Sequence, residues 1–483
     1  TDFAHLRSAV KSIVLFELNE VPFRILEYFV TESPGSNLAR FYGKFKRHKT
    51  YTEDSGHLSP WKTWPTLHRG TTNEMHMLHD FGQPLEEIDR QYPPVWKILS
   101  AHGIRTGVFG SLHSYPLPKK EAYCFYVPDV FSSSPECSPD YLEPLQDLTL
   151  KMSRESGRNV SRSVPMKEAL AVLGSLPKVG IRLKTVGSVI SQLVSERIHK
   201  WKSVRRRTFQ TVIAFDAFLK QMEIHKPQFA TFFTNHVASS MHRYWAAAFP
   251  GDYKRLGYDQ DWIDTYKGEI LYSMDKADEM IGDLIAFADK NNYRLLITSS
   301  MGQSAIENEP LETQLWITSP ERFFNRIGLR AWARRPAMFA QFNFIVENDA
   351  LELAERAVQS VEINGEKLVY RRDGQFFSLD FGHPNLKELN IAIGGVSVLP
   401  KDCGLENISI EDKSTSSAYH IPEGTLLIYE EGENGRDAQK ISTLEIAPYI
   451  LKNFGLDVPG YMRATDLGES PARIESLTRS SSF

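Results

Sequence analysis

Length, composition and charge limit the class of protein. The chain has 483 residues, of which 41% are hydrophobic and 24% are charged, and its formal net charge is −4. These values allow a large buried core, either in one big α/β domain with insertions or in two to three ordinary domains, and they exclude the strongly basic balance typical of nucleic-acid-binding domains.

Short apolar segments alternate with helical segments along the chain. Residues 12–18 predict a buried strand that ends at Asn19 and Glu20, and a helix follows it. A helix followed by a strand then recurs three times, within residues 94–110, 215–234 and 263–299. This alternation predicts an α/β fold with a mostly parallel central sheet, helices on both of its faces, and ligands at the carboxyl ends of the strands.

The pattern changes in two places, which we expect to be additions to the sheet core. After residue 110, a Pro- and Ser-rich loop followed by helical sequence predicts a helical cap insertion, and a later segment with one helix and several strands predicts a small α/β or antiparallel addition. The Ser- and Arg-rich end predicts a disordered tail. The expected division is core 1–110, cap 111–210, core 211–335, addition 336–400, core 401–468 and tail 469–483.

The end of the cap, residues 182–207, is rich in Lys and Arg interleaved with apolar side chains. This pattern suits a helix that lies on an anionic membrane surface. It also suits the solvated face of a cap helix packed against the core, which is the commoner origin of a charge run and the interpretation we favour. A peripheral membrane contact through 182–207 is therefore one of two hypotheses.

The cysteines and the apolar segments bear on location. Three cysteines without metal-ligand spacing favour reduced thiols over a disulfide framework. No apolar run is long enough to span a bilayer, and residues 1–12 lack the apolar segment of a signal peptide. We therefore expect a cytoplasmic protein, at most peripheral at the membrane, although the chain does not begin with Met and the sequence leaves open whether a leader was removed.

Three segments carry a family resemblance. Residues 61–66 read Trp-Lys-Thr-Trp-Pro-Thr and are followed by His76, residues 420–429 begin with His-Ile-Pro-Glu-Gly, and residues 445–459 form a closing helix. These segments resemble the type I phosphodiesterase and nucleotide pyrophosphatase branch of the alkaline phosphatase superfamily. The resemblance implies an alkaline-phosphatase-like fold and places the family's nucleophilic hydroxyl at Thr63.

The resemblance also implies a two-metal site, several of whose ligands are substituted here. Asn19 stands where the family has a metal-binding Asp at the end of the first strand, and Ser300 and Met301 stand where it has Asp and His. Asparagine is a neutral and weaker ligand, and serine and methionine are poor ligands for a hard or borderline cation. We therefore expect this metal position to be lost.

The other metal position keeps two histidines, His242 and His420, although Ala238 replaces the family's Asp. Two imidazoles and an improvised third ligand, such as His236 or a nearby carboxylate, are enough to hold one divalent ion, Zn or Mn, with an open position. The candidate metal ligands are therefore Asn19, His236, His242 and His420.

Two carboxylates at the first strand are candidates for acid or base catalysis. Glu17 lies in an otherwise apolar strand, and Glu20 follows that strand. Burial raises the pKa of a carboxyl toward the range useful for proton transfer, whereas the alternative for Glu17 is that strand alternation turns it toward a buried partner. The candidate substrate-binding residues supply cationic, aromatic or amide groups: Lys62, Trp64, His76, Asn235 and Arg243.

Three functions stay open. The resemblance implies a phosphodiesterase-like hydrolase or a phosphoryl-group transferase acting on phosphoester or phosphoanhydride bonds, with Thr63 as nucleophile. A metal-free glycan or sugar-nucleotide transferase on the same fold would use Glu17 or Glu20 as its base, and a catalytically inactive binding protein would explain the lost ligands most simply. The expected partner is a phosphate-containing small molecule, a nucleotide or a lipid-linked glycan, with no nucleic acid, and the oligomeric state stays open.

Overall fold

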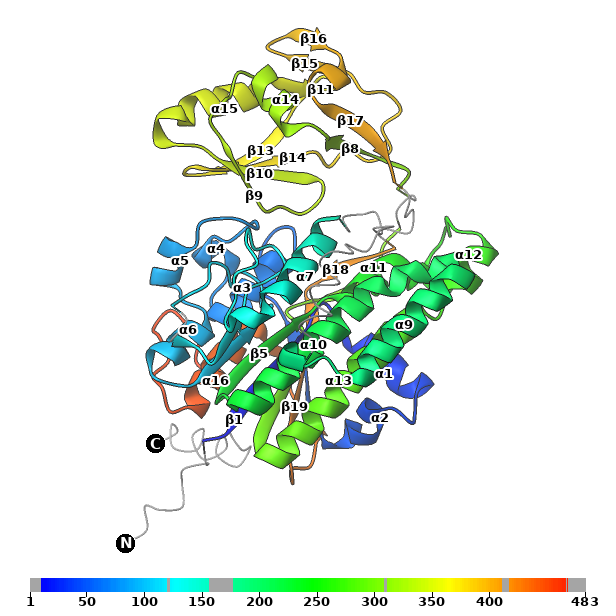
Figure 1. Cartoon of the computed structure of the whole chain (residues 1–483), viewed down its shortest axis with the longest axis vertical. Coiled ribbons are helices and arrows are strands. Elements are labelled where there is room, and N and C mark those ends of the chain that lie inside the picture. Colours follow the sequence, from blue (N-terminus) through cyan, green and yellow to red (C-terminus); the bar gives the residue numbers. More distant parts are fainter. Residues whose placement is uncertain are drawn as a thin grey trace, which may run out of the picture.

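The computed structural model describes residues 10–119, 122–155, 177–307, 311–410, 417–465 and 467. Part of the predicted cap insertion, residues 156–176, and the whole predicted tail, 469–483, lie outside the described residues. Figure 1 shows the layered core with a second, smaller body of strands and helices stacked at one end of it.

A nine-stranded sheet forms the core, in the order β20-β2-β19-β6-β1-β5-β3-β4, with β21 also paired to β2. β1 lies at its centre, parallel to both β5 and β6, and β19 joins β6 and β2 in antiparallel fashion. The strands are β1 (Ser12–Leu18), β2 (Lys46–Tyr51), β3 (Thr106–Phe109), β4 (Phe125–Val127), β5 (Phe229–Thr234), β6 (Tyr293–Thr298), β19 (Glu423–Tyr429), β20 (Arg436–Asp437) and β21 (Ile441–Ser442). The predicted mostly parallel central sheet is confirmed.

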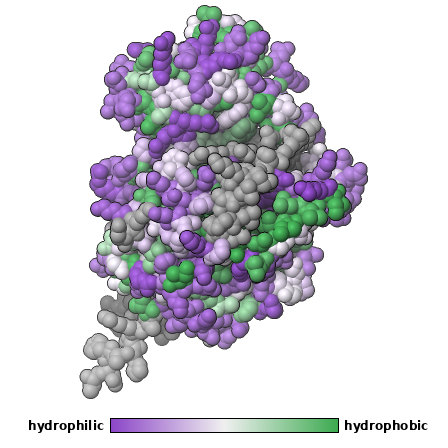
Figure 2. All heavy atoms as spheres, in the orientation of Figure 1, coloured by the Kyte–Doolittle hydropathy of each residue, from purple (hydrophilic) through white to green (hydrophobic). Residues whose placement is uncertain are grey.

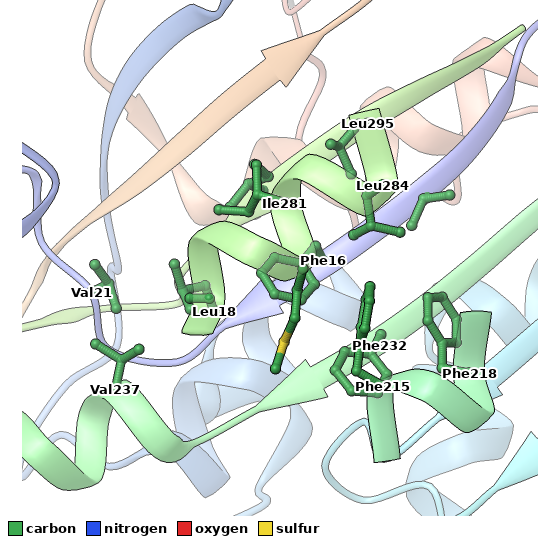
Figure 3. Close-up of a cluster of buried hydrophobic side chains, with 14 of the residues drawn as sticks. Phe16, Leu18, Val21, Phe215, Phe218, Phe232, Val237, Ile281, Leu284 and Leu295 are labelled. Atoms are coloured by element: carbon green, nitrogen blue, oxygen red, sulfur yellow. The ribbon is translucent and has the colours of Figure 1, made fainter. Parts of the chain in front are cut away.

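Helices cover both faces of this sheet because its central strands are apolar on both sides. On one face, β1 contributes Phe16 to a core with Phe215, Phe232 and Ile281, drawn in Figure 3. On the other face, Ile13 packs into a second cluster. The first face carries α1 (Phe23–Glu32), α10 (Arg206–His225), α11 (His236–Ala248) and α13 (Glu269–Asn291), and the second carries α3 (Pro60–Arg69), α6 (Val95–Ala101) and α16 (Ile446–Asn453).

Further helices complete the core and the described part of the insertion. They are α2 (Asn37–Phe41), α4 (Asn73–His76), α5 (Glu86–Gln91), α7 (Glu143–Glu155), α9 (Leu183–Ile198) and α12 (Gln260–Tyr266). In Figure 1, α9 runs alongside α10 and α13, to which Arg182 ties it through ion pairs with Asp216 and Asp283 at 2.5 and 2.6 Å. Within the described ranges, none of the helices combines the length and the apolar character needed to cross a membrane.

The predicted antiparallel addition is confirmed and has its own hydrophobic cluster. Its strands are β9 (Ala333–Arg335), β10 (Gln341–Ile345), β11 (Val361–Ile363), β12 (Glu366–Lys367), β13 (Val369–Asp373), β14 (Phe376–Asp380), β15 (Ile391–Ile393) and β16 (Val396–Val398), beside α14 (Pro320–Arg326) and α15 (Leu351–Gln359). The cluster also includes residues beyond 336–400, because β8 (Thr313–Ile317) pairs with β17 (Leu405–Ser409).

Polar contacts attach this addition to the core close to the predicted nucleophile loop. Arg371 forms an ion pair with Asp80, Gln83 donates to Asp373 at 2.7 Å, and Asn343 donates to the carbonyl of Phe81 at 2.8 Å. These contacts involve the segment just after α4. The addition is therefore attached to the core at residues 80–83, which follow the nucleophile loop and α4 in the chain.

Candidate functional site

The candidate site lies at the carboxyl end of β1, in the middle of the sheet edge. Parallel pairing places the ends of β5 and β6 on either side of it, which is where α/β sheets bind ligands. After Leu18 the chain turns sharply, and Glu20 adopts a left-handed conformation with φ +60°. Such a conformation is uncommon for a residue other than glycine. The Glu20 side chain is buried at this end of the sheet.

Two histidines from distant segments meet Glu20. The Oε2 atom of Glu20 lies 2.9 Å from Nε2 of His242 on α11 and 3.4 Å from Nε2 of His420 on β18 (Ala418–Ile421). Gln303, on β7 (Gly302–Ala305), donates to the same oxygen. Among the described residues, Glu20, His242 and His420 offer ligand atoms that lie within 4.8 Å of one another. We call these three residues the Glu-His-His group.

Backbone carbonyls orient both imidazoles of the Glu-His-His group. Nδ1 of His242 donates to the carbonyl of Ala418 at 2.8 Å, and Nδ1 of His420 donates to the carbonyl of Leu58 at 2.7 Å. When the proton of a neutral imidazole is on Nδ1, the lone pair of Nε2 is available, which is one of the two arrangements seen in metal-binding histidines. Both Nε2 atoms therefore present either a metal ligand or, when protonated, a cation to the Glu20 carboxylate.

The charges of the group stabilise one another. Burial by itself raises the pKa of the Glu20 carboxyl, but His420 and His242 hold that pKa well below its usual range. Burial lowers the pKa of His420, but attraction to Glu20 and the hydrogen bond to Leu58 outweigh burial, so that the pKa is raised. The carboxylate thus stays ionised and attracts positive charge, whether a proton or a metal ion, to the space between the rings.

Thr63 occupies a different kind of environment. It lies in the first turns of α3, is fully buried, and its Oγ1 is 2.7 Å from Oγ of Ser300 and donates to the carbonyl of Ser59 at 3.3 Å. A hydroxyl and a carbonyl are not bases at neutral pH, so these two partners do not activate the threonine oxygen.

Asn19 connects the two environments. Its Oδ1 accepts a hydrogen bond from Nε1 of Trp64 at 2.7 Å, and its Nδ2 donates to Glu20 Oε1 at 2.9 Å and to Asn235 Oδ1 at 2.7 Å. The buried amide therefore holds Glu20 beside the residue that follows Thr63. The amide oxygen of Asn19 is engaged by Trp64 and its nitrogen supports Glu20, so Asn19 acts as a partner of the Glu-His-His group rather than as a fourth ligand.

Glu17 forms a second buried carboxylate–imidazole pair on the other face of β1. Its Oε1 lies 2.6 Å from Nε2 of His68 on α3, and both side chains are buried. Strand alternation turns Glu17 away from Glu20 and toward this partner. This is the second of the two interpretations that the sequence leaves open for Glu17, and the His68 ring packs between Trp64 and Trp96.

His236 does not join the Glu-His-His group. Its Nδ1 is 2.9 Å from the Thr234 hydroxyl and its Nε2 is 3.0 Å from the carbonyl of Ser273. Burial lowers the pKa of His236 to about 4, although the Ser273 carbonyl opposes this shift. The ring is therefore a neutral structural group between α11 and α13, and the carboxylate of Glu20 takes the third position instead.

The predicted substrate-binding residues lie in two places. Asn235 is exposed beside Asn19, and Lys62 donates to the carbonyl of His57 at 3.0 Å, so both lie near the nucleophile loop. His76 is buried against the Thr66 hydroxyl at 2.9 Å, and burial lowers its pKa well below the usual value. Arg243 donates to the carbonyl of Ser239 within α11 at 3.2 Å.

Two residues near the group were not predicted. Gln303 binds Glu20 because β7 pairs with β18 and sets Gln303 opposite His420. His57 lies 2.8 Å from the Tyr419 hydroxyl, and its ring is close to that of His420. The only sequence signal for Gln303 is its place just after the substituted Ser300-Met301 pair, and that signal does not reveal the strand pairing.

The donor set of the Glu-His-His group fits one divalent ion. Two imidazole nitrogens and one carboxylate oxygen are the protein ligands of many catalytic zinc sites, which keep a further position open. The hydrogen bonds from Nδ1 of His242 and His420 to backbone carbonyls fix the orientation of the two rings, as the second nitrogen of a metal-binding histidine usually does. The Thr63–Ser300 pair offers only hydroxyls and does not fit a second ion of this kind.

Comparison with known proteins places the chain in a family. The family described as type I phosphodiesterase / nucleotide pyrophosphatase matches residues 51–375. The chain belongs to this family. The matched phosphodiesterase region includes Thr63 and His242, whereas Glu20 and His420 lie outside it, so the family match alone does not identify the complete Glu-His-His group.

The solved structures that match the chain are remote in sequence. Phosphonoacetate hydrolase from Sinorhizobium meliloti 1021, in complex with phosphonoformate, has 10% identity and a TM-score of 0.42, with 92% of this chain and 95% of that chain covered. Murine ectonucleotide pyrophosphatase / phosphodiesterase 5 has 10% identity and a TM-score of 0.39, with 95% and 99% covered. No curated protein matches the chain.

Proposed function

We propose that this chain processes phosphoester or phosphoanhydride bonds, as a hydrolase or as a transferase, with one divalent ion, Zn or Mn, at the Glu-His-His group. Membership of the phosphodiesterase family supports the class of bond. The observation that carries the proposal is the contact of Glu20 with both His242 and His420. Glu20 supplies in space the carboxylate that is missing at Ala238.

A bound divalent ion would supply positive charge for the oxygens of a phosphoryl group. The chain's own residues prepare that position. The carbonyls of Ala418 and Leu58 hold the two imidazoles in the ligand tautomer, and Asn19 holds the Glu20 carboxylate through Oε1. Lys62 and Asn235 are proposed to orient the phosphate-containing substrate, because both lie beside the network that links Glu20 to the nucleophile loop.

Thr63 is proposed as the nucleophile that the resemblance implies. Attack by its Oγ1 on phosphorus forms an O–P bond and breaks the bond between phosphorus and the leaving oxygen, which takes up the proton that the threonine hydroxyl loses. Ser300, whose Oγ lies 2.7 Å from Oγ1, orients the threonine oxygen for this attack. Because Thr63 is fully buried, substrate must displace the covering contacts before attack.

The test measures metal content and turnover in the full chain. The protein is loaded with Zn²⁺ or Mn²⁺, dialysed and analysed by elemental mass spectrometry, and hydrolysis of bis-p-nitrophenyl phosphate is followed in parallel. We expect about one retained ion per chain, as in a three-ligand site, and its loss in His242→Ala and His420→Ala. His102→Ala, at an exposed histidine outside the site, is the matched control. Metal retention equal to the control in both site variants would contradict the proposal.

One observation favours a second candidate, metal-free transfer to or from an activated sugar or a lipid-linked glycan. Glu20 Oε2 is already approached by Gln303 and by two imidazoles, so protons alone satisfy the carboxylate. In that case Glu20 and His420 act as an acid–base pair. Turnover by metal-free protein would support this candidate, and binding without turnover would support an inactive binding protein.

A reducing, cytoplasmic location is also proposed. None of the three cysteines, Cys124, Cys137 and Cys403, is in a disulfide bond, and Cys137 and Cys403 are buried. Free thiols are typical of proteins kept in a reducing compartment. Fractionation of cells followed by thiol labelling tests this location.

A further inference from the structure

α9 exposes its apolar side chains and buries its polar ones. Five large apolar residues on its outer side are exposed: Leu183 (89%), Ile190 (58%), Leu193 (41%), Val194 (53%) and Ile198 (72%). The side chains on its inner side are polar and buried: Thr185, Gln192 and Glu196. A surface helix of a globular protein normally shows the reverse arrangement. We call the five exposed apolar residues the α9 strip.

The α9 strip is continuous on the surface of the molecule. Its members are spaced at three, four and seven residues, which places them along one side of the helix. Figure 2 shows an apolar patch on the outer surface where Figure 1 places α9. Contiguous exposed apolar patches of this kind mark surfaces that bind a partner or a membrane.

Buried polar contacts hold α9 in this orientation. Gln192 donates to the carbonyl of Lys202 at 2.7 Å and to Glu196 at 2.9 Å, and Glu196 forms an ion pair with Arg206 at 2.7 Å. At the N-terminal end, Arg182 is paired with acidic residues of α10 and α13. Rotating α9 to bury its apolar side would break these bonds and leave buried polar groups without partners. The outward position of the strip is therefore held by these polar contacts.

A polar hollow of about 450 Å³ lies beside the α9 strip, between α9 and the neighbouring helices α10 and α13. Its lining includes three cations, Lys184, Arg205 and Lys276, and four side chains with a hydroxyl, Ser188, Ser191, Ser195 and Tyr272. The two lysines are also paired with carboxylates outside the lining, Lys184 with Asp283 at 3.8 Å and Lys276 with Glu279. Arg205 is held in place by Glu269 at 2.7 Å. Cationic and hydroxyl donors of this kind bind the oxygens of a phosphate group.

We propose that α9 attaches this protein to an anionic lipid bilayer. The α9 strip enters the boundary between headgroups and acyl chains, and the adjoining hollow receives the phosphate of a lipid headgroup. The order of the groups favours a bilayer over a protein partner, because the cations border the apolar strip just as headgroups border acyl chains. The exposed Arg197 and Lys200 extend the positive border at the C-terminal end of α9. This inference does not depend on the proposed catalytic function.

The test is co-sedimentation of the full chain with phosphatidylcholine vesicles, with and without phosphatidylserine. We expect binding to the vesicles that contain phosphatidylserine, and a loss of about tenfold or more when four strip residues are changed together, Leu183→Ser, Ile190→Ser, Val194→Ser and Ile198→Ser. The matched control changes exposed apolar residues of the antiparallel addition, Val369→Ser, Val396→Ser and Leu399→Ser, and should bind as the unmodified chain does.

A second variant, with Lys184→Gln and Lys276→Gln, tests the role of charge. It should bind phosphatidylserine vesicles more weakly than the unmodified chain, and its binding should depend less on salt concentration. Equal vesicle binding by the strip variant and the unmodified chain would overturn the proposal. A second outcome would also overturn it: neither chain binds vesicles, and size-exclusion chromatography with light scattering shows a dimer of the unmodified chain that the strip variant does not form. Turnover of a soluble diester should be unchanged in the strip variant, which separates this result from the proposed function.

Discussion

The Glu-His-His group and the Thr63–Ser300 pair occupy the two halves of one site, yet they differ in chemistry. In the first half, three ionisable side chains converge, and we propose that Glu20 replaces the carboxylate that is missing at Ala238. In the second half, Ser300 gives Thr63 a neutral hydroxyl partner, and Met301 is buried. If this proposal holds, a missing ligand is replaced from another part of the chain, because the sheet edge brings a suitable side chain to the same point.

The largest expected effect comes from removing the Thr63 hydroxyl. Thr63→Ala should reduce turnover to background, while metal content stays that of the unmodified chain, because Thr63 touches none of the three ligands. Thr63→Ser keeps the hydroxyl and should retain turnover. Steady-state kinetics and elemental analysis of both variants test this separation, and full turnover by Thr63→Ala would remove the nucleophile role.

Neutralising Glu20 should abolish the other half of the site. Glu20→Gln removes the only carboxylate in the group, and we expect Zn²⁺ affinity to fall by at least about 100-fold, since even outer contacts of metal ligands cost 10–100-fold when lost. Isothermal titration calorimetry measures the affinity, and circular dichroism checks the fold. Glu223→Gln, at an exposed position on α10, is the control. If both variants bind Zn²⁺ equally, Glu20 is not a ligand.

Acid should affect histidines inside and outside the group in opposite directions. Burial lowers the pKa of His236 and of His113 to about 4, so below about pH 6.5 the unfolded chain binds protons that the folded chain does not. Protonation of these two histidines in the unfolded chain therefore lowers the free energy of unfolding as pH falls from about 6.5 to 4, on the order of a few kcal/mol in total.

His420 should behave in the opposite way in metal-free protein. Its pKa is raised, although burial opposes the shift, so its stabilising contribution is complete below about pH 6.5 and is lost as pH rises through the folded-state value. Histidine NMR titration should show His420 protonated at a pH where His236 is neutral. If His420 and His236 lose their protons over the same pH range, the raised pKa of His420 and its attraction to Glu20 would be contradicted.

The smallest expected effect comes from the residue that links the two halves. Trp64→Phe removes the donor to the buried Asn19 Oδ1 and should lower the free energy of unfolding by about 1–3 kcal/mol, the cost of an unpaired buried polar atom. Urea denaturation measures the change, with Trp332→Phe in the antiparallel addition as the control. A loss no larger than that of the control would show that Asn19 finds another partner.

Sequence alone was enough for the features that depend on neighbouring residues. The apolar runs of β1, β5 and β6 and the period of α13 predicted the layered sheet, because burial on both faces and on one helix side leaves a local pattern. The Trp-Lys-Thr-Trp-Pro-Thr loop and the His-Ile-Pro-Glu-Gly segment predict Thr63 and His420 as site residues through the family resemblance, and their roles stay predictions. These predictions need no knowledge of which strands pair.

The tertiary structure decided which side chains meet. Glu20 rather than His236 lies beside His242 and His420, because the turn after β1 places Glu20 at the sheet edge. The two nitrogens of His236 are engaged elsewhere, by Thr234 of β5 and by Ser273 of α13. The pairing of β7 with β18 brings in Gln303, and buried polar bonds decide that the apolar side of α9 faces outward. The spacing of apolar residues predicts that a helix has an apolar side and a polar side, but only packing against the rest of the chain determines which side is buried.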